Sequence, residues 1–346
     1  MTRPRYRAGR PPDFRREQRA GAGAAGPGQT GGMRDFRFSC NVFAIRSQAE
    51  FTGYCTAAEE SGYDVVFTTD HLGSPAPFPP LVAAAAATRR LRVGTLVLNV
   101  GFWNPHLLAR EVATVDLLTG GRLELGLGAG HMKWEYDAAG IAWPPFAERA
   151  GHLAATLDEL DRLFGSEGYP DGAPGREFFG LPVQAPVQRR ASGRPGPPII
   201  IGGTGDRILA LAARRADTVA LAGAVQAPGQ PPGTFRMASA DEAAERVRFI
   251  RDQAGERFAD LELNVLVQAV VVTDDRRAAA PQLAAERFPG FTPEQVLDTP
   301  FLLIGTIDEI AEQVLERRQR YGFSFLTVHE PFMRAFAPVI GRLRAG

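Results

Sequence analysis

The residues best suited to do chemistry are Asp70 and His71, which directly follow an apolar run from Val65 to Thr69. A histidine titrates near neutral pH, so its ring can give or take a proton at a reacting carbon or heteroatom. Asp70 could orient that ring, or it could cap the next segment of the chain. A histidine that only hydrogen-bonds the loop backbone is the structural alternative. The pair indicates a general acid/base site.

Two further histidines, His131 and His329, also end predicted strands. In a barrel of alternating strands and helices, the C-terminal strand ends share one face, and active sites lie there. We therefore expect the three histidines to gather at one mouth. The chain's other two histidines, His106 and His152, lie on predicted helices and are interpreted as surface or packing residues.

Glycines follow two of the predicted strands, in Gly126–Gly130 and Gly202–Gly205. Backbone N–H groups at the start of a helix bind anions, and glycine allows close approach, so the second stretch predicts a phosphate cradle. Such glycines more often only form a tight turn between a strand and a helix. Aromatic residues in the loops after the third and fourth strands suit a flat, partly apolar ligand, or else pack the insertion: Phe102, Trp103, Trp134 and Trp143.

No metal site is predicted. A barrel metallohydrolase needs paired histidines on an early strand, and the first strand shows Ser39-Cys-Asn41 there. No Gly-x-Ser-x-Gly nucleophile elbow is present either. An acid/base pair and a phosphate cradle without a nucleophile require a cofactor for the difficult chemical step.

The elements that position these residues are eight apolar segments that alternate with helices. The predicted strands cover residues 36–43, 65–69, 91–98, 122–127, 198–201, 217–221, 261–272 and 323–328. This alternation predicts an α/β fold, a (β/α)8 TIM barrel with insertions. A doubly wound open sheet is the alternative, but the chain after the first strand lacks Gly-x-Gly-x-x-Gly.

Serine or threonine precedes three predicted helices, with glutamate three residues later, at Ser47, Ser239 and Thr306. Each is a capping-box pattern that predicts where a helix begins. Three long connections remain: an insertion at 131–145, a Gly- and Pro-rich loop at 165–197, and a candidate lid at 223–238.

Composition limits the remaining possibilities. The chain has 346 residues, 45% of them hydrophobic, and zero formal net charge, so neither nucleic acid nor an anionic membrane is an expected partner. Cys40 and Cys55 lack metal or redox spacing, which predicts reduced thiols in a cytoplasmic protein. Residues 1–32 are rich in Arg, Gly, Pro and Ala, which predicts a disordered or non-native extension before a single domain at 33–346.

Four stretches together resemble one known family: Thr69–Gly73, Arg92–Asn99, Gly120–Gly130, and Ile304–Glu309 with Gly322–His329. Over roughly residues 36–344 the chain is similar to the luciferase-like monooxygenase superfamily, and within it to oxidoreductases that use coenzyme F420, a 5-deazaflavin. The resemblance implies hydride transfer between the deazaflavin and a small organic substrate, in a homodimer. An FMN-dependent monooxygenase is the alternative, and a barrel that binds a flavin without turnover is the further one.

The resemblance also implies roles for individual residues. His71 is the proton-transfer group, and Asp70 both assists catalysis and contacts the cofactor. A non-prolyl cis peptide bond at Leu96–Val97 backs the ring. Further cofactor contacts fall at Asn99, Gly128, Ala129, Gly202, Gly203 and Thr204.

One substrate class is not expected. The sugar-phosphate dehydrogenases of the family carry glutamate at the position of His131 and use lysines to hold the substrate phosphate. The only lysine here is Lys133. His131 is therefore either a second proton-transfer group or a residue that lines the loop.

Overall fold

The computed structural model describes residues 34–165, 185–231, 233–288 and 290–345. Asp35–Gly346 form one compact unit. The extension predicted at 1–32 lies outside the described residues, as does most of the irregular loop predicted at 165–197.

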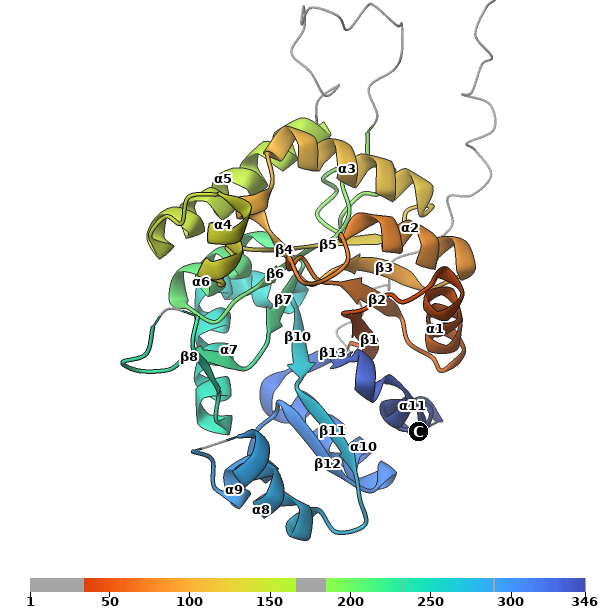
Figure 1. Ribbon diagram of the computed structural model, residues 1–346, viewed down its shortest axis with the longest axis vertical. Helices are drawn as coiled ribbons and strands as arrows, with labels where there is room; N and C mark the ends of the chain where they lie inside the picture. The colour runs from red at the N-terminus through yellow and green to blue at the C-terminus, as the bar shows by residue number, and fades with distance from the viewer. Residues whose placement is uncertain (1–33, 166–184, 232, 289, 346) are drawn as a thin grey trace, which may run out of the picture. The chain divides into compact units, whose positions relative to one another are not determined.

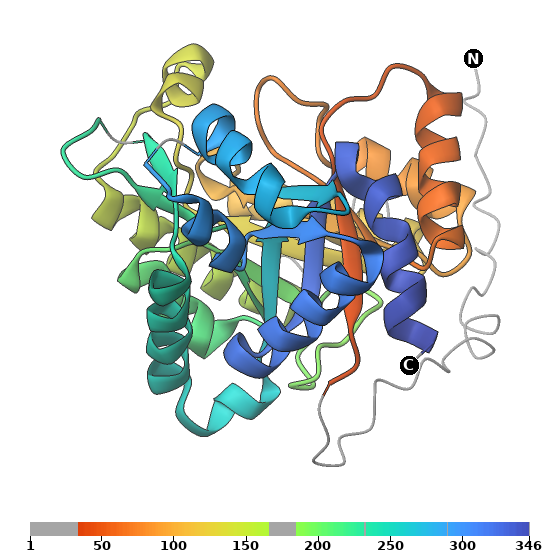
Figure 2. The ribbon, with the colours of Figure 1, turned by 90° about the horizontal axis from the view of Figure 1, so that it is seen from below.

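Parallel strands close into a barrel, as the sequence predicts (Figures 1 and 2). The ring is closed because β2 pairs with β3 and β3 pairs with β5, while β5 leads through β6, β7, β10, β13 and β1 back to β2. Its strands are β1 (Arg37–Val42), β2 (Val65–Thr68), β3 (Arg92–Thr95) continued by β4 (Leu98–Asn99), β5 (Leu123–Gly128), β6 (Ile199–Gly202), β7 (Thr218–Leu221), β10 (Glu262–Val267) and β13 (Phe323–His329).

Helices cover the outside of this barrel (Figure 1). They are α1 (Gln48–Glu60), α2 (Phe78–Ala87), α3 (Pro105–Leu118), α5 (Phe146–Gly165), α6 (Asp206–Arg215), α7 (Ala240–Ala254), α10 (Ile307–Tyr321) and α11 (Met333–Ala345). The main core lies between strands and helices. A smaller apolar cluster includes Phe67, Ile200 and Phe325, which come from non-adjacent strands and fill the barrel interior.

Two of the three predicted capping boxes are complete. The side chains of Ser239 and Thr306 accept the N–H three residues on, and the glutamates reach back to the cap N–H. At α1 only half forms: Ser47 accepts from the Glu50 N–H, but the Glu50 carboxylate pairs with Arg46 at 2.9 Å. A basic neighbour competes for that carboxylate, which the spacing pattern does not reveal.

The single strand predicted at 261–272 is wrong. Gln268 separates β10 from β11 (Ala269–Val272), and β11 pairs with β12 (Leu302–Gly305), a strand that the sequence analysis did not assign. With α8 (Arg276–Arg287) and α9 (Pro293–Asp298), these strands build a satellite cluster. Both halves consist mostly of apolar residues, so the hydrophobic pattern of the sequence does not show where the chain leaves the barrel.

Three smaller predictions are refined. The strand predicted at 91–98 is interrupted at Leu96–Val97, where the expected non-prolyl cis peptide bond is present. The lid predicted at 223–238 contains an antiparallel hairpin of β8 (Ala224–Gln226) and β9 (Phe235–Met237). The insertion at 131–145 contains the short helix α4 (Lys133–Ala139).

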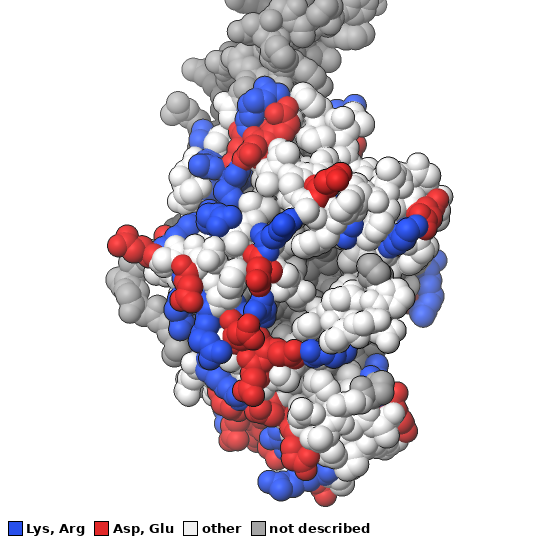
Figure 3. Space-filling model, turned by 90° about the vertical axis from the view of Figure 1, so that its left-hand side faces the viewer, with Lys and Arg blue, Asp and Glu red and all other residues white. Residues whose placement is uncertain are grey.

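Acidic and basic side chains are interspersed on the face that Figure 3 displays. Some ion pairs join neighbouring helices: Arg215 binds Asp158 on α5, and Arg246 binds Asp206 on α6. None of the helices in the described ranges is long and apolar enough to cross a membrane.

Candidate active site

His71 lies at the C-terminal end of β2 and is paired with a buried carboxylate. Its Nδ1 is 2.8 Å from Oε1 of Glu135, and the same oxygen accepts the backbone N–H of Leu72 at 3.2 Å. The Glu135 side chain is 3% exposed, while that of His71 is 33% exposed. The sequence does not reveal Glu135 as a partner, because it lies 64 residues from His71 and no local pattern links the two.

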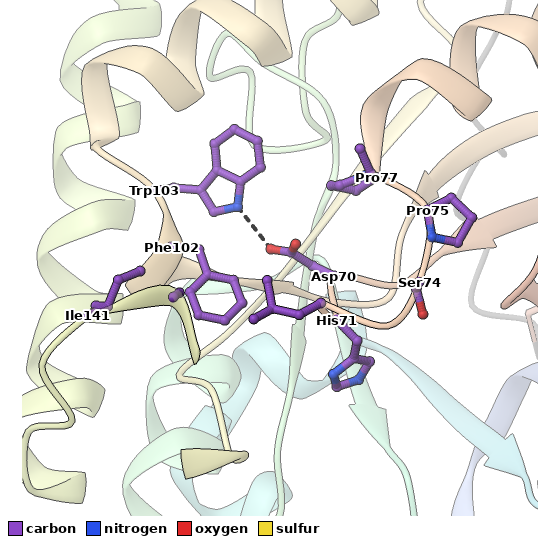
Figure 4. A pocket seen from close by; sticks show the side chains of 11 residues that line it. Asp70, His71, Ser74, Pro75, Pro77, Phe102, Trp103 and Ile141 are labelled. Carbon is purple, nitrogen blue, oxygen red and sulfur yellow. Dashed lines mark hydrogen bonds between the residues drawn. The ribbon is translucent and has the colours of Figure 1, made fainter. Parts of the chain in front are cut away.

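Asp70 does not orient His71, and it does not cap the following segment. Its Oδ2 accepts the Asn99 N–H at 3.0 Å and the Trp103 Nε1–H at 2.9 Å (Figure 4). Burial raises the pKa of the Asp70 carboxyl, against the opposing effect of the Trp103 hydrogen bond. Asp70 therefore ties the end of β2 to β4 and to the 3-10 turn η1 (Val100–Phe102) that follows it.

His131 meets His71 edge-to-face, with ring centroids 5.5 Å apart and planes at 88°. On its other side His131 lies 5.5 Å from the ring of Phe235 in the hairpin. Burial, and then the neighbouring His71, lower the pKa of His131, which favours a neutral ring. The structure thus brings together two of the three predicted histidines, while His329 contacts Gln268 and Phe43.

Val97 lies across the ends of β5 and β6. A Cβ atom on Gly128 would be 2.7 Å from Val97 Cγ2, and one on Gly202 would be 3.1 Å from Val97 Cγ1. The two glycines are needed because the valine occupies that space. Leu96, before the cis bond, packs on the apolar cluster inside the barrel. The result is an apolar floor at the C-terminal mouth.

Asn99 lies beside this floor, and among the described residues only the oxygen of its side-chain amide is hydrogen-bonded. Its Oδ1 accepts the Tyr136 hydroxyl at 2.8 Å and the Gly101 N–H at 3.1 Å. Its Nδ2 is buried and has no hydrogen-bond partner within the described part of the chain. Buried donors are almost always satisfied, so this one suits an acceptor on a bound molecule.

The two glycine stretches have different surroundings. Ala129 is 8% exposed, and Gly130 has φ +74°; a Cβ there would lie 2.4 Å from Asn99 Oδ1, so the turn after β5 closes on Asn99. Gly203 and Thr204 lead into α6, and a Cβ on Gly203 would lie 2.4 Å from Ile208 Cγ2. The backbone thus passes close to the helix start, which suits a phosphate.

A cavity of about 380 Å³ opens beside Asp70 and His71 (Figure 4). Its wall is mostly apolar and comes from the loop after β2, from η1 and from the end of α4: Leu72, Ser74, Pro75, Ala76, Pro77, Phe102, Trp103, Ala139 and Ile141. Two of the four predicted aromatic residues line it. Trp143 packs on Tyr136 instead, and Trp134 is 54% exposed.

Among the residues that the structure describes, no cluster of three or more His, Cys, Asp or Glu side chains could hold a metal ion. The arrangement offers an apolar floor, a free amide donor, a helix-start cradle and a histidine–carboxylate pair. These features suit a flat heterocyclic cofactor with ring carbonyls and a phosphate, placed next to a proton-transfer group.

Comparison with known proteins defines the class. The sequence profile of the luciferase-like monooxygenase family matches residues 35–297. The chain therefore belongs to this family.

Its relatives include several proteins named F420-dependent glucose-6-phosphate dehydrogenase. The one from Beutenbergia cavernae is 27% identical over 335 residues, which cover 90% of this chain and 97% of the relative. The one from Kribbella flavida is 34% identical over 148 residues, 40% of this chain and 43% of the relative. The match thus spans less than half the length of that relative, and likewise 41% of the one from Amycolatopsis mediterranei.

Solved structures share the fold. An F420-dependent secondary alcohol dehydrogenase in complex with an F420–acetone adduct superposes with a TM-score of 0.65 at 17% identity, covering 90% of this chain and 100% of that chain. Monooxygenase RslO1 from Streptomyces bottropensis gives a TM-score of 0.62 at 22% identity, with coverages of 89% and 97%. At these identities the likeness establishes the barrel alone.

Proposed function

We propose that this protein is a coenzyme F420-dependent oxidoreductase that transfers a hydride between the deazaflavin and a small, uncharged organic substrate. The observation that carries the proposal is the His71–Glu135 pair at 2.8 Å, which stands at the same mouth as the floor of Val97 and the free amide of Asn99. F420-dependent relatives support the choice of cofactor.

The residues at the mouth fit this cofactor. Val97, which lies against Gly128, provides an apolar surface for a flat ring, and Leu96 precedes it in the chain. Ala129 follows Gly128 at the end of β5 and is proposed as a further cofactor contact. Asn99 Nδ2 can donate to a ring carbonyl, and Asp70 holds Asn99 through its backbone N–H. Gly202, Gly203 and Thr204 approach the start of α6, where a phosphate can be bound.

When bound, F420 supplies the hydride-carrying carbon C5. His71 gives or takes the proton that accompanies hydride transfer. Glu135 accepts from Nδ1 of His71 and stabilises the ring when it is charged. His131 is held as a neutral second histidine against His71 and lines the substrate side together with Phe235.

The substrate is proposed to lack a phosphate, unlike the sugar phosphate in the names of the relatives. Cations on the segments around His131 are engaged within the chain. Lys133 binds Asp137 at 2.7 Å, Arg149 stacks 3.6 Å over Trp143, and Arg236 pairs with Glu242. Binding a substrate phosphate would require breaking these contacts.

Separate titrations with F420 and FMN, followed by tryptophan fluorescence, test the proposal, because Trp103 lines the cavity. Preferential F420 binding supports it. Preferential FMN binding with substrate-dependent oxygen uptake favours the luciferase-like monooxygenase, the fold of RslO1. Binding without any turnover favours a non-catalytic flavin-binding barrel, and binding of neither cofactor removes the redox assignment.

We also propose a cytoplasmic homodimer whose catalytic domain is 33–346. The free, buried state of Cys40 and Cys55 agrees with a reducing compartment, and dimerisation rests on the family resemblance. Light scattering and F420 titration of the full chain and of a chain lacking residues 1–32 test the dimer and the domain boundary: both chains are expected to be dimers and to bind F420 with equal affinity.

A further inference from the structure

Helix α4 touches both parts of the proposed site through consecutive residues. Glu135 binds His71, and Tyr136 binds Asn99. Neighbours on an α-helix point about 100° apart, so one short helix can hold side chains on two different strands. We propose that α4 is the positioning element of the site: Glu135 sets which nitrogen of His71 carries the proton, and Tyr136 sets the amide orientation of Asn99. This inference rests on the proposed function and deepens it.

The carboxylate settles the direction of the first hydrogen bond. An ionised carboxylate only accepts, so Oε1 of Glu135 accepts both the Leu72 N–H and the Nδ1–H of His71. Imidazole has its second nitrogen on the far side of the ring, so Nε2 is left to exchange the proton with the substrate. A carboxylate as buried as Glu135 is costly unless paired, which holds it against these two donors.

The second bond is settled in the same way. The Gly101 N–H donates to Oδ1 of Asn99, so the Tyr136 hydroxyl also donates to Oδ1, and Nδ2 is left as a donor. Room for that hydroxyl is built in, because a Cβ on Gly101 or Gly130 would lie 2.1 or 2.5 Å from it.

Tyr136 is itself held firmly. It is 1% exposed and packed between the rings of Phe102, 5.2 Å away, and Trp143, 4.7 Å away. The hydroxyl therefore has one fixed position, and only the N–H₂ group of the Asn99 amide is left without a partner among the described residues.

Three adjacent substitutions separate the two roles. Glu135→Gln is expected to lower kcat about 10- to 100-fold, because no carboxylate fixes the His71 tautomer, while the F420 Kd stays within about twofold. Tyr136→Phe is expected to raise the F420 Kd about 3- to 10-fold without lowering kcat in this way, because only the Asn99 amide loses its clamp. Asp137→Asn, at an exposed pair with Lys133, should change neither.

The cofactor-free protein gives an independent readout. Histidine ¹⁵N NMR, with His71 assigned through His71→Asn, should show the Nδ1–H tautomer in the wild type and a shift toward Nε2–H in Glu135→Gln. A wild-type Nε2–H tautomer overturns the inference even if F420 is turned over. If both variants alter both readouts equally, α4 is merely structural and the inference fails. Absence of F420 binding with the Nδ1–H tautomer intact overturns the proposed function while it supports the Glu135 assignment.

Discussion

The two ends of the barrel use polar residues in different ways. At the N-terminal end, charged residues at or next to the strand starts form ion pairs with one another: Arg37, Arg92, Glu124 and Glu262. At the C-terminal end, three neutral polar side chains each have a buried atom without a partner among the described residues: Asn41, Asn99 and His329. The same strands thus carry arginine–glutamate pairs for stability at one end and unpaired neutral polar atoms, suited to a ligand, at the other.

The N-terminal network is centred on Glu124, which is 1% exposed. Its Oε1 accepts from Arg37 and, at 2.6 Å, from Arg92, although Oε2 has no partner in the described ranges. Burial alone raises the pKa of Glu124, but the two guanidinium groups outweigh burial and lower it. Glu124 is therefore charged at neutral pH, and its neighbours compensate its desolvation.

The C-terminal end shows the contrast at Asn41 and His329, register neighbours on β1 and β13. Asn41 Oδ1, His329 Nδ1 and Asn99 Nδ2 are buried with no partner in the described chain. Burial lowers the pKa of His329 to about 4, so this ring is neutral at working pH. Buried groups left open in this way are typical of a site that a bound molecule completes.

The largest expected effect is at the N-terminal end. Glu124→Ala should lower the free energy of unfolding by about 3–5 kcal/mol, because it leaves two arginines without their shared buried carboxylate. Urea unfolding measures this. Glu50→Ala is the control, since its pair with Arg46 is exposed and should contribute less than about 0.5 kcal/mol. Equal losses of unfolding free energy in Glu124→Ala and Glu50→Ala would show that the buried network contributes no more than an exposed ion pair.

The two ends should also lose stability in different pH windows. His329 has a folded-state pKa of about 4, below its ordinary 6.5, so the unfolded chain binds the proton more readily. Its contribution is complete above pH 6.5 and is lost as pH falls to 4, by about 3 kcal/mol. Glu124 has a lowered pKa, so its contribution is lost only below about pH 4.5. The free energy of unfolding of His329→Gln, measured in urea, should depend less on pH than that of the wild type between pH 6.5 and 4, and equally below pH 4. An unchanged pH dependence between 6.5 and 4 would contradict the role given to His329.

At the C-terminal end, catalysis should respond more than stability. His71→Ala should reduce turnover about 100-fold or more, because the proton-transfer group is lost. Its free energy of unfolding should fall by about 1–3 kcal/mol, less than in Glu124→Ala, because the buried Glu135 carboxylate loses the His71 donor but keeps the Leu72 N–H. His106→Ala, at an exposed pair with Glu159, is the control and should keep full turnover. Near-wild-type turnover in His71→Ala would rule out the role.

The smallest effect is expected on F420 binding, from a change at the Asn99 amide. Asn99→Asp keeps the Oδ1 acceptor for Gly101 and Tyr136 but replaces the Nδ2 donor by an oxygen. The F420 Kd should rise about tenfold, which corresponds to about 1.4 kcal/mol. Asn104→Asp is the matched control, because Asn104 caps α3 through its oxygen and aspartate caps equally well. Identical affinities in the two variants would show that Nδ2 does not meet the cofactor.

Local features of the fold were predictable because short-range chemistry produces them. Alternating apolar segments predict the barrel, and the capping boxes at Ser239 and Thr306 place two helix starts correctly. The family resemblance predicts the cis bond at Leu96–Val97, which the structure contains. The end of β10 before Gln268 was not predictable, because a mostly apolar strand has the same sequence pattern inside the barrel and outside it.

The candidate site divides in the same way. Asp70 and His71 follow from where an apolar run stops, and Asn99 follows from the family resemblance. Their partners do not, since Glu135 and Tyr136 come from an insertion whose helix has no signal that links it to β2 or β4. Asp70 shows the point most clearly: it adjoins His71 in sequence, yet it binds Asn99 and Trp103.

The sequence by itself determined the barrel, two of its helix starts and the strand ends at which the candidate site lies, because these depend on periodicity and on contacts within a few residues. Only the tertiary structure decided which carboxylate holds His71 and which amide atom of Asn99 is left open. Those bonds join residues 64 and 37 positions apart, and chain closure, not local preference, brings their atoms within hydrogen-bond distance.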